Sequence, residues 1–232
     1  MSEVPASALA IYAHPDDPDV GCGGTLAAWS SGGCAVHVLL CTDGDKGTPD
    51  RHADSQALAR LRAAEAAAAG QVVGVASQEF LHYPDGELDH DPALVAALVG
   101  VIRRIRPQVV LCPDPTAVFF GQSYFNHRDH RVTGWAALDA VAPAAALPKY
   151  FPETGEAHQV STVLLSGTLE PNVWVDISGV LESKVRAIGC HRTQFPDGPD
   201  LVMAAVRSGA EDAGRRVGVD FAEGFRRLRF DG

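Results

Sequence analysis

The sequence predicts an α/β protein: a Rossmann-like parallel sheet flanked by helices, with a smaller C-terminal β/α extension. Short apolar runs alternate with longer segments of helical period, which is the pattern of βαβ units. Two of these runs, 35–41 (AVHVLLC) and 109–112 (VVLC), are almost continuously apolar, as in strands that are covered on both faces. With 46% hydrophobic and 21% charged residues, the 232-residue chain has the composition of a globular protein.

The first half of the chain carries clear signals for the ends of its elements. An alanine-rich segment should form a long helix that ends at Gly70, and Asp91 followed by Pro92 is typical of a helix start. Pro113 should close the last of these strands. In chain order we expect a strand over 8–12, a helix over 23–31, a strand over 35–41, a helix over 54–69, a short strand near 80–81, a helix over 91–106 and a strand over 109–112.

The regular alternation of apolar runs ends at about residue 142, after which prolines become frequent. We expect strands over 160–166 and 173–176, a helix over about 179–190, a last helical stretch, and a short basic segment at 222–230. No composition shift is sharp enough to mark a domain boundary. We therefore expect a single domain over 1–232, with a core over about 1–142 and an extension over about 143–232.

The formal charge of −10 excludes several classes of partner. An acidic chain without a basic stripe does not suit a general nucleic-acid binder or a protein that docks on an anionic membrane. The N-terminal segment has no signal-peptide pattern, and no apolar run is long enough to span a bilayer. The five cysteines form no CxxC pair, as in a reducing compartment. We expect a cytoplasmic protein with a small-molecule partner, and homo-oligomerisation stays open.

A dense polar motif, Ala13-His14-Pro15-Asp16-Asp17, directly follows the first strand. Ligands of open parallel sheets bind beyond the carboxyl ends of the strands, so this imidazole and its two carboxylates are candidates for a site. The alternative is a polar turn or helix cap. The glycines at 21–24 could be interpreted as a phosphate loop, but they match neither common nucleotide-binding motif.

A second motif, 126–131 (NHRDHR), follows the apolar strand 109–112 across a loop. His127 and His130 are three residues apart, so they share one face if a helix begins here. A lone histidine at a helix start would more often be a cap. Together the two motifs offer histidine, aspartate and histidine to one metal, which is the ligand number of a catalytic zinc site with an open position. The same set resembles the facial triad of non-haem iron enzymes, so Fe²⁺ is an alternative metal.

Motifs along nearly the whole chain resemble the LmbE-like family, also called the N-acetylglucosaminyl-phosphatidylinositol deacetylase (PIG-L) superfamily. The resemblance implies a zinc-dependent hydrolase that removes an N-acetyl or other N-acyl group from an amino sugar or its glycoside. The segments that carry it are AHPDD (13–17), CTDGDKG (41–47), Arg62 with Glu65, YPDGEL (83–88), NHRDH (126–130), HRTQ (191–194) and AEGFR (222–226).

The resemblance also implies roles for individual residues. Asp16 becomes the general base that takes a proton from metal-bound water, and a protonated His127 stabilises the tetrahedral intermediate. Asp129 becomes the partner of His127 or a residue that orients its neighbours. One Zn²⁺ per chain is implied, although other divalent metals stay open. Its implied ligands are His14, Asp17 and His130.

The candidate substrate-binding residues are Arg62, Phe119, Tyr124, Phe125 and His191. The aromatic residues lie in a long loop, 114–125, that should border the metal, although a subunit interface or a lid is an alternative. Arg62 could instead pair with Glu65, and His191 could be a core histidine. Some family members carry a tyrosine two residues before the first histidine of the second motif. This chain has Phe125 there, so the resemblance leaves a tyrosine role open.

Two other functions compete with the N-deacetylase. An amidase of the same fold could cleave a larger N-acyl or thiol conjugate with the same set of motifs. A nucleotide-binding module would use the glycines at 21–24, but it would leave His14, Asp17 and His130 unexplained as a group. The sequence does not identify the substrate.

Overall fold

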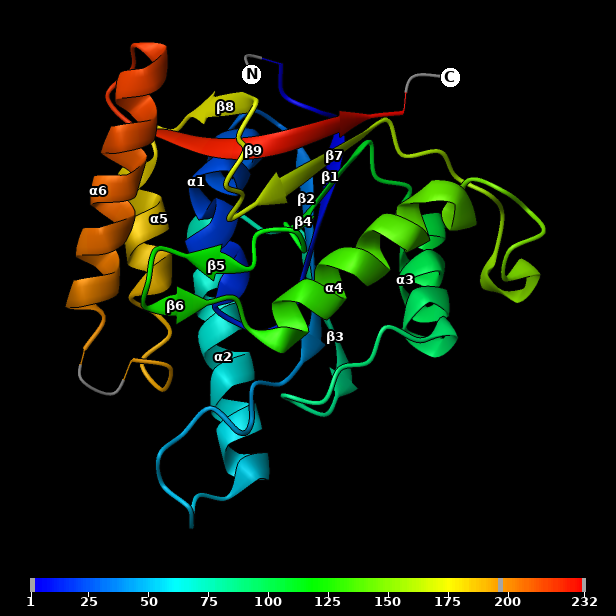
Figure 1. The fold of residues 1–232 in the computed structure, drawn as a ribbon, viewed down its shortest axis with the longest axis horizontal. Helices are drawn as coiled ribbons and strands as arrows, with labels where there is room; N and C mark the ends of the chain where they lie inside the picture. The colour runs from blue at the N-terminus through cyan, green and yellow to red at the C-terminus, as the bar shows by residue number, and fades with distance from the viewer. Residues whose placement is uncertain (1–2, 196–197, 231–232) are drawn as a thin grey trace.

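The computed structural model describes residues 3–195 and 198–230. Within these residues the centre of the molecule is a seven-stranded sheet of order β3-β2-β1-β4-β7-β9-β8 (Figure 1). The strands from β3 to β7 in this order run parallel, whereas β9 lies antiparallel to both β7 and β8. The predicted parallel α/β sheet with a C-terminal extension is confirmed.

The elements follow one another with few long connections. The strands are β1 (Ser7–Tyr12), β2 (Ala35–Thr42), β3 (Ser77–Tyr83), β4 (Val109–Pro113), β5 (Phe119–Phe120), β6 (Tyr124–Phe125), β7 (Thr162–Ser166), β8 (Val173–Asp176) and β9 (Ala222–Arg229). The helices are α1 (Asp17–Ser31), α2 (Ser55–Val73), α3 (Pro92–Ile105), α4 (Arg128–Asp139), α5 (Leu181–Ile188) and α6 (Asp200–Val217), with shorter helical turns at Ala140–Ala145 and Pro152–Thr154. In the part of the chain that the structure describes, no helix combines the length and apolarity needed to cross a membrane.

Three elements differ from the expectation. Helix α1 begins at Asp17, six residues before the expected start, because Pro18 is tolerated in a first turn where its missing N–H would be unpaired anyway. The expected loop 114–125 contains the two-stranded ribbon β5–β6. The basic segment 222–230 contributes a strand, β9, that lies inside the sheet.

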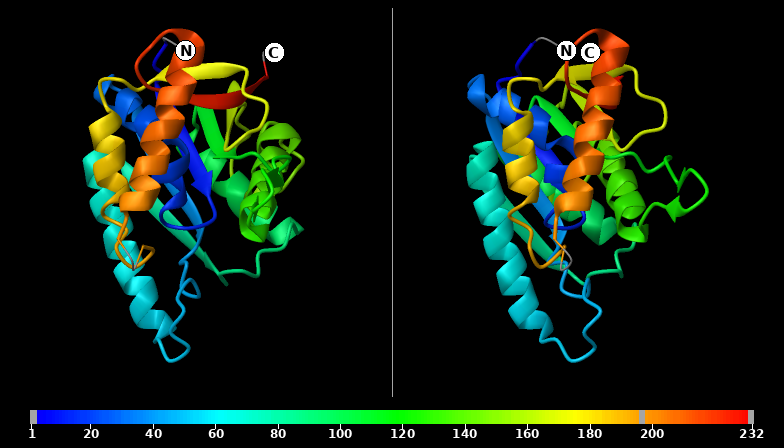
Figure 2. Two further views of the ribbon diagram at one scale, coloured as in Figure 1. Left: turned by 60° about the vertical axis from the view of Figure 1, so that its left-hand side comes forward. Right: turned by 90° about the vertical axis from the view of Figure 1, so that its left-hand side faces the viewer.

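Helices cover both faces of the sheet (Figures 1 and 2). Helices α1, α2 and α5 pack on one face, and α3 and α4 pack on the other. Strand β1 shows why both faces are apolar: Ala8, Ala10 and Tyr12 point into the first core, while Leu9 and Ile11 point into the second. Such a strand has no polar face, which explains its continuous apolar sequence.

The order of the strands creates a crevice beyond the carboxyl ends of β1 and β4. The chain proceeds from β1 to β2 and β3 on one side, and then returns to place β4 on the other side of β1. The segments that follow β1 and β4 therefore diverge, which is where ligands bind in open α/β sheets. The two polar motifs of the sequence lie in these two segments.

The glycine-rich segment 21–24 lies within helix α1 and serves packing. A Cβ atom on Gly24 would lie 2.8 Å from Cδ1 of Ile177, so only glycine allows this approach. The backbone N–H groups of Gly24 and Thr25 donate to the carboxylate of Glu223, which also pairs with Lys184. Because a buried carboxylate already occupies these donors, the structure does not support a phosphate loop here.

Candidate metal centre and active site

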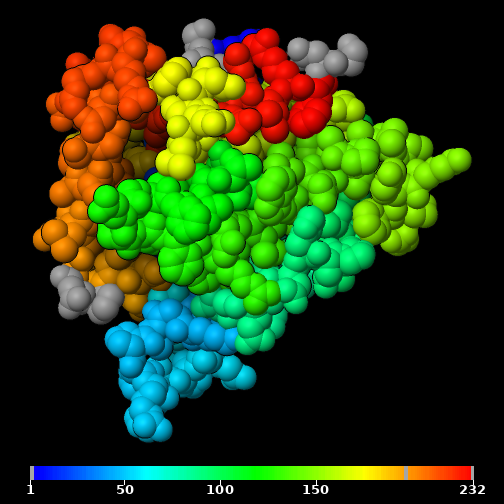
Figure 3. All heavy atoms as spheres, viewed as in Figure 1, coloured from blue at the N-terminus to red at the C-terminus, as the bar shows by residue number. Residues whose placement is uncertain are grey.

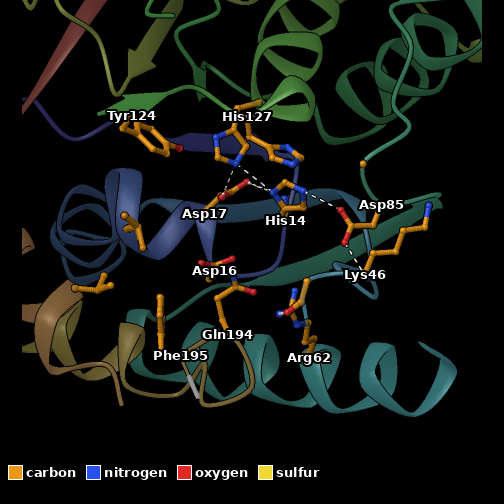
Figure 4. Close-up of a pocket in the computed structure, with 15 residues that line it drawn as sticks. His14, Asp16, Asp17, Lys46, Arg62, Asp85, Tyr124, His127, Gln194 and Phe195 are labelled. Atoms are coloured by element: carbon orange, nitrogen blue, oxygen red, sulfur yellow. Dashed lines mark hydrogen bonds and ion pairs between the residues drawn. The ribbon is translucent and has the colours of Figure 1, made fainter. Parts of the chain in front are cut away.

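Three donor side chains, which we call the donor trio, converge at this crevice: His14, Asp17 and His130. Figure 4 shows His14 and Asp17 side by side. His14 follows β1, Asp17 is the first residue of α1, and His130 lies in the first turn of α4. Nδ1 of His14 is 3.1 Å from Nε2 of His130 and 3.3 Å from Oδ2 of Asp17. Nε2 of His130 is 3.1 Å from Oδ1 of Asp17. The three residues that the motifs suggested as ligands thus form one compact triangle.

The hydrogen bonds behind the trio decide which ring nitrogens are free. Nε2 of His14 lies 3.1 Å from Oδ1 of Asp85, and Nδ1 of His130 lies 3.0 Å from Oδ1 of Asn126. Each of these outer nitrogens faces an oxygen acceptor and therefore carries the proton of a neutral ring. In neutral rings the two inner nitrogens consequently present lone pairs toward each other and toward the Asp17 carboxylate.

This arrangement fits a metal ion. Two lone pairs and a carboxylate at such short separations repel one another unless a cation lies between them. Ligands of a tetrahedral ion with bonds of about 2.0–2.1 Å are about 3.3 Å apart, which is close to the separations within the trio. An acceptor on the outer nitrogen of each histidine is also typical of metal-binding imidazoles.

The surrounding charges favour a cation as well. Burial opposes a charge on His14, but Asp17, Asp129 and Asp85 outweigh it and raise the pKa of this imidazole well above its ordinary value. Burial likewise opposes the charge of Asp17, yet His130 and His14 hold the pKa of its carboxyl well below the usual range. The carboxylates that attract a proton to this centre would also attract a divalent cation.

Asp129 supports the centre from behind. Its buried carboxylate accepts hydrogen bonds from the backbone N–H groups of Gly86 and Leu88, and Oδ2 lies 3.6 Å from Nε2 of His14. None of its described side-chain hydrogen bonds reaches the ring of His127. Of the two expected roles, the structure therefore favours the one that orients neighbouring groups.

His127 stands at the N-terminus of α4 with its ring against the cavity (Figure 4). Its Nδ1 accepts a hydrogen bond from the backbone N–H of Asp129, so the proton of the neutral ring lies on Nε2. Burial, with the charges of His14 and His130, lowers the pKa of His127. The lowered pKa makes the protonated form of His127 harder to reach, and a neutral ring would present the Nε2–H group as a donor.

Asp16 lies beside the trio and makes no side-chain cap bond to α1, although it occupies the N-cap position. Burial raises its pKa, the charge of Asp17 adds to this, and His191 and His14 oppose it, so that the pKa rises to about 6. A carboxylate with such a pKa is still mostly ionised at neutral pH, yet it binds a proton more readily than an ordinary aspartate. The carboxylate of Asp16 is therefore suited to accept a proton.

A cavity of about 670 Å³ opens in front of these groups. It lies among segments that follow β1, β2, β3, β4 and α5, several of which meet on the face shown in Figure 3. Its lining residues are His14, Asp16, Asp17, Val20, Lys46, Gly47, Arg62, Asp85, Gly86, Tyr124, His127, His130, Gln194, Phe195 and Val202.

The aromatic ribbon β5–β6 presents only one of its faces to the site. Phe119 pairs with Phe125 and Phe120 with Tyr124, so the two pairs point to opposite faces of the ribbon. Tyr124 lines the cavity, whereas Phe119 and Phe125 are 72% and 65% exposed and lie outside its wall. The residue at the position expected from the resemblance, Phe125, is thus not at the site, but a tyrosine is.

The other two predicted substrate-binding residues differ in their placement. Arg62 is buried at the cavity floor, where its guanidinium donates to the carbonyl oxygens of Gly44 and Gly47. Glu65, its alternative partner, accepts instead from Thr193. His191 is 1% exposed and bonds to Asp19, so it lies behind Asp16 rather than at the cavity wall.

Sequence reasoning missed three polar residues of this site. Asp85 holds His14, and Lys46 and Gln194 line the cavity. Among the described residues, Nε of Arg62 and Oε1 of Gln194 are buried without a hydrogen-bond partner, in two side chains that line the cavity. The motifs YPDG and HRTQ marked Asp85 and Gln194, but nothing in them indicated these contacts.

Comparisons with known proteins show which family the chain resembles in sequence and fold. The family model described as PIG-L, GlcNAc-PI de-N-acetylase, matches residues 9–141. Diacetylchitobiose deacetylase from Thermococcus kodakarensis is 36% identical, over 94% of this chain and 81% of the relative. A 1D-myo-inositol 2-acetamido-2-deoxy-alpha-D-glucopyranoside deacetylase from Rhodococcus erythropolis is 29% identical, over 84% of each chain. The solved structure of N,N'-diacetylchitobiose deacetylase from Pyrococcus horikoshii superimposes with a TM-score of 0.89 at 32% identity, covering 97% of this chain and 84% of that one.

Proposed function

The chain belongs to the PIG-L family of de-N-acetylases, and on this premise we propose that it hydrolyses the acetamido group of a 2-acetamido sugar or its glycoside. The relatives from Thermococcus and Rhodococcus are named for different molecules, but both names contain an N-acetylated amino sugar. The observation that carries the proposal is the donor trio with the free carboxylate of Asp16 beside it in one polar cavity.

We propose that His14, Asp17 and His130 hold one Zn²⁺. When bound, Zn²⁺ supplies a Lewis acid that lowers the pKa of water and polarises a carbonyl oxygen. Asp85 and Asn126 fix the two imidazoles in the tautomers that leave a lone pair for the metal.

Asp16 serves as the general base in this proposal. Its carboxylate is next to a ligand in the chain, lines the cavity and is free of a cap bond, so it can accept the proton of the attacking water. The same proton can then pass to the departing amine nitrogen, which needs one before the carbon–nitrogen bond breaks.

His127 stabilises the oxyanion as a neutral donor. The backbone bond to its Nδ1 fixes the proton on Nε2, and the ring lines the cavity beside the trio. A fixed N–H donor near the carbonyl oxygen is worth about 10²–10³-fold in rate. Asp129 acts indirectly, because it holds the 86–88 turn and faces His14.

The sugar is proposed to lie on the polar side of the cavity, toward Arg62, Lys46 and Gln194. All three side chains line this part of the cavity and carry polar groups that can hydrogen-bond to the hydroxyl groups of a sugar. Tyr124 offers an aromatic face at the opposite wall (Figure 4).

Acetate release from diacetylchitobiose and from an N-acetylglucosaminyl inositol, measured on zinc-supplemented protein, tests the activity. Asp16→Asn should retain the metal but lose turnover by about 10²–10⁴-fold, because only the proton acceptor is removed. A metal-loaded Asp16→Asn variant with wild-type turnover would show that Asp16 is not the base. Metal-loaded wild-type protein that releases acetate from neither substrate would contradict the proposed substrate class.

A further inference from the structure

One wall of the main cavity belongs to a short segment that follows α5. Residues 192–194 form a turn, and the side chains of Gln194 and Phe195 line the cavity (Figure 4). Among the described residues, Oε1 of Gln194 has no hydrogen-bond partner, and the ring of Phe195 has no polar atom. The position of these two side chains therefore depends on the backbone that carries them.

Thr193 ties this segment to the body of the molecule. Its backbone N–H donates to Oε1 of Glu65 at 3.0 Å, and its hydroxyl group donates to Oε2 at 2.6 Å. The backbone N–H groups of Arg192 and Gln194 instead donate to carbonyl oxygens at 190 and 191, within the same turn. Hydrogen bonds to a carboxylate are stronger than those between neutral groups, so Glu65 is the main polar anchor of this wall.

Glu65 lies on α2, a long helix that packs against α1 and α5 and that holds a second wall of the cavity as well. Arg62 precedes Glu65 by three residues on the same helix face, and its guanidinium donates to the carbonyl oxygens of Gly44 and Gly47. The described hydrogen bonds of the Glu65 side chain, in contrast, all go to Thr193. The Glu65 carboxylate therefore serves the segment after α5 alone.

We propose that Glu65 is a positioning residue for substrate binding: it holds the backbone at Thr193 and thereby fixes Gln194 and Phe195 where they contact the sugar. This inference rests on the proposed function. Neither of these two side chains belongs to the groups that act on the reacting carbonyl. Loss of the anchor should therefore weaken the binding of substrate and transition state alike, which raises KM and leaves kcat nearly unchanged.

The kinetics of acetate release from diacetylchitobiose, on zinc-supplemented protein, test this role. Glu65→Ala suits an alanine-rich helix and should raise KM by about tenfold, with kcat within about twofold of wild type and an unchanged zinc content. Glu65→Gln keeps an acceptor oxygen for Thr193 and should recover most of the loss. The matched control is Gln71→Ala, which removes an exposed side chain from the same helix and should leave KM unchanged. An unchanged KM in Glu65→Ala, or a fall in kcat alone, would overturn the proposal.

A double-mutant cycle with Thr193→Val shows whether Glu65 acts through Thr193. Valine has a similar shape but removes the hydroxyl group that donates to Glu65, so Thr193→Val alone should raise KM by a smaller factor than Glu65→Ala. In the double variant the two factors should not multiply, because both substitutions remove the same hydrogen bond. Factors that multiply would show that Glu65 affects substrate binding by another route and would overturn the proposal.

Amide hydrogen exchange separates this proposal from the proposed function, because it requires no turnover. The amide of Thr193 should exchange faster in Glu65→Ala than in wild type, and Glu65→Gln should slow it again. If exchange follows this order while wild type releases acetate from no acetylated sugar, the anchor stands and the proposed function fails. If wild type releases acetate but Glu65→Ala changes neither exchange nor KM, the positioning role fails and the function stands.

Discussion

Two polar clusters beside helix α1 differ in whether their hydrogen bonds are complete: the Lys184–Glu223 pair and the donor trio. Lys184 and Glu223, 3% and 7% exposed, form a buried ion pair whose partners all belong to the chain: Nζ of Lys184 also donates to the carbonyl of Val20, and Glu223 accepts from two backbone N–H groups of α1. The donor trio instead lines a cavity, where a ligand can reach its side chains. A polar group stabilises this fold where its bonds are complete, and it can act on a ligand where they are left open.

The largest effect should come from His14→Ala, which removes one member of the donor trio. The variant should lose the metal and lower deacetylase activity by at least about 10³-fold, while it unfolds at nearly the temperature of metal-free wild type. Metal analysis and thermal unfolding together check this. A full zinc content in the variant would show that the metal does not depend on this imidazole.

Breaking the Lys184–Glu223 pair should lower stability and leave activity almost unchanged. Lys184→Met leaves the Glu223 carboxylate buried without its counter-charge, and the free energy of unfolding should fall by about 3–5 kcal/mol. Denaturant unfolding measures this loss, while kcat per folded molecule should change little. The control is Arg207→Met, which removes an ion pair with Glu182 that is open to solvent and should leave stability unchanged. Equal losses of unfolding free energy in Lys184→Met and Arg207→Met would contradict the distinction between the buried and the exposed ion pair.

Asp85→Ala should have a smaller effect than either of these variants. Asp85 holds the outer nitrogen of His14, and its carboxyl pKa of about 2 reflects burial outweighed by hydrogen bonds from His14 and the Lys46 backbone. We expect metal affinity to fall by about 10–100-fold, because the ring loses its orientation. Competition with a chelator measures this. Glu87→Ala, an exposed carboxylate in the same segment, is the control and should bind metal normally.

The smallest effect concerns pH and the pair Asp19–His191 behind the site. Burial opposes the charge of His191, but the hydrogen bond and charge of Asp19, with Asp16 and Glu65, outweigh it and raise the pKa of His191. The stabilisation is therefore complete below the ordinary histidine pKa of about 6.5 and is lost as pH rises through the raised value. The difference in unfolding free energy between wild type and His191→Gln should shrink from pH 6 to pH 9. A difference that grows with pH would show that the neutral ring is the stabilising form.

Local patterns predicted the sheet and placed two polar motifs at one edge of it, whereas the choice of His14, Asp17 and His130 as ligands came from the family resemblance. Apolar runs define strands without knowledge of their neighbours, and each motif follows a strand whose carboxyl end must lie at the site. The contact between His14 and Asp85 could not be predicted in the same way. It joins residues 71 positions apart, and it depends on the register of the parallel strands and on the turn after β3.

The orientation of the aromatic rings in the β5–β6 ribbon was also beyond prediction from the sequence. Its composition suggested a substrate wall made of Phe119, Tyr124 and Phe125, but the alternation of side chains in two paired strands turns two of these rings toward solvent. Composition identifies the segment, whereas one step of register decides which rings face the ligand.

The donor trio joins distant parts of the chain, so a bound metal would also affect the stability of the protein. His14 and His130 are 116 residues apart in the chain, and the five cysteines are all free thiols. A metal held between them would act as a reversible cross-link between the first strand and the fourth helix. The population of unfolded molecules would then follow mass action with free zinc, so that a cell or a buffer poor in zinc would shorten the half-life of this protein toward proteases.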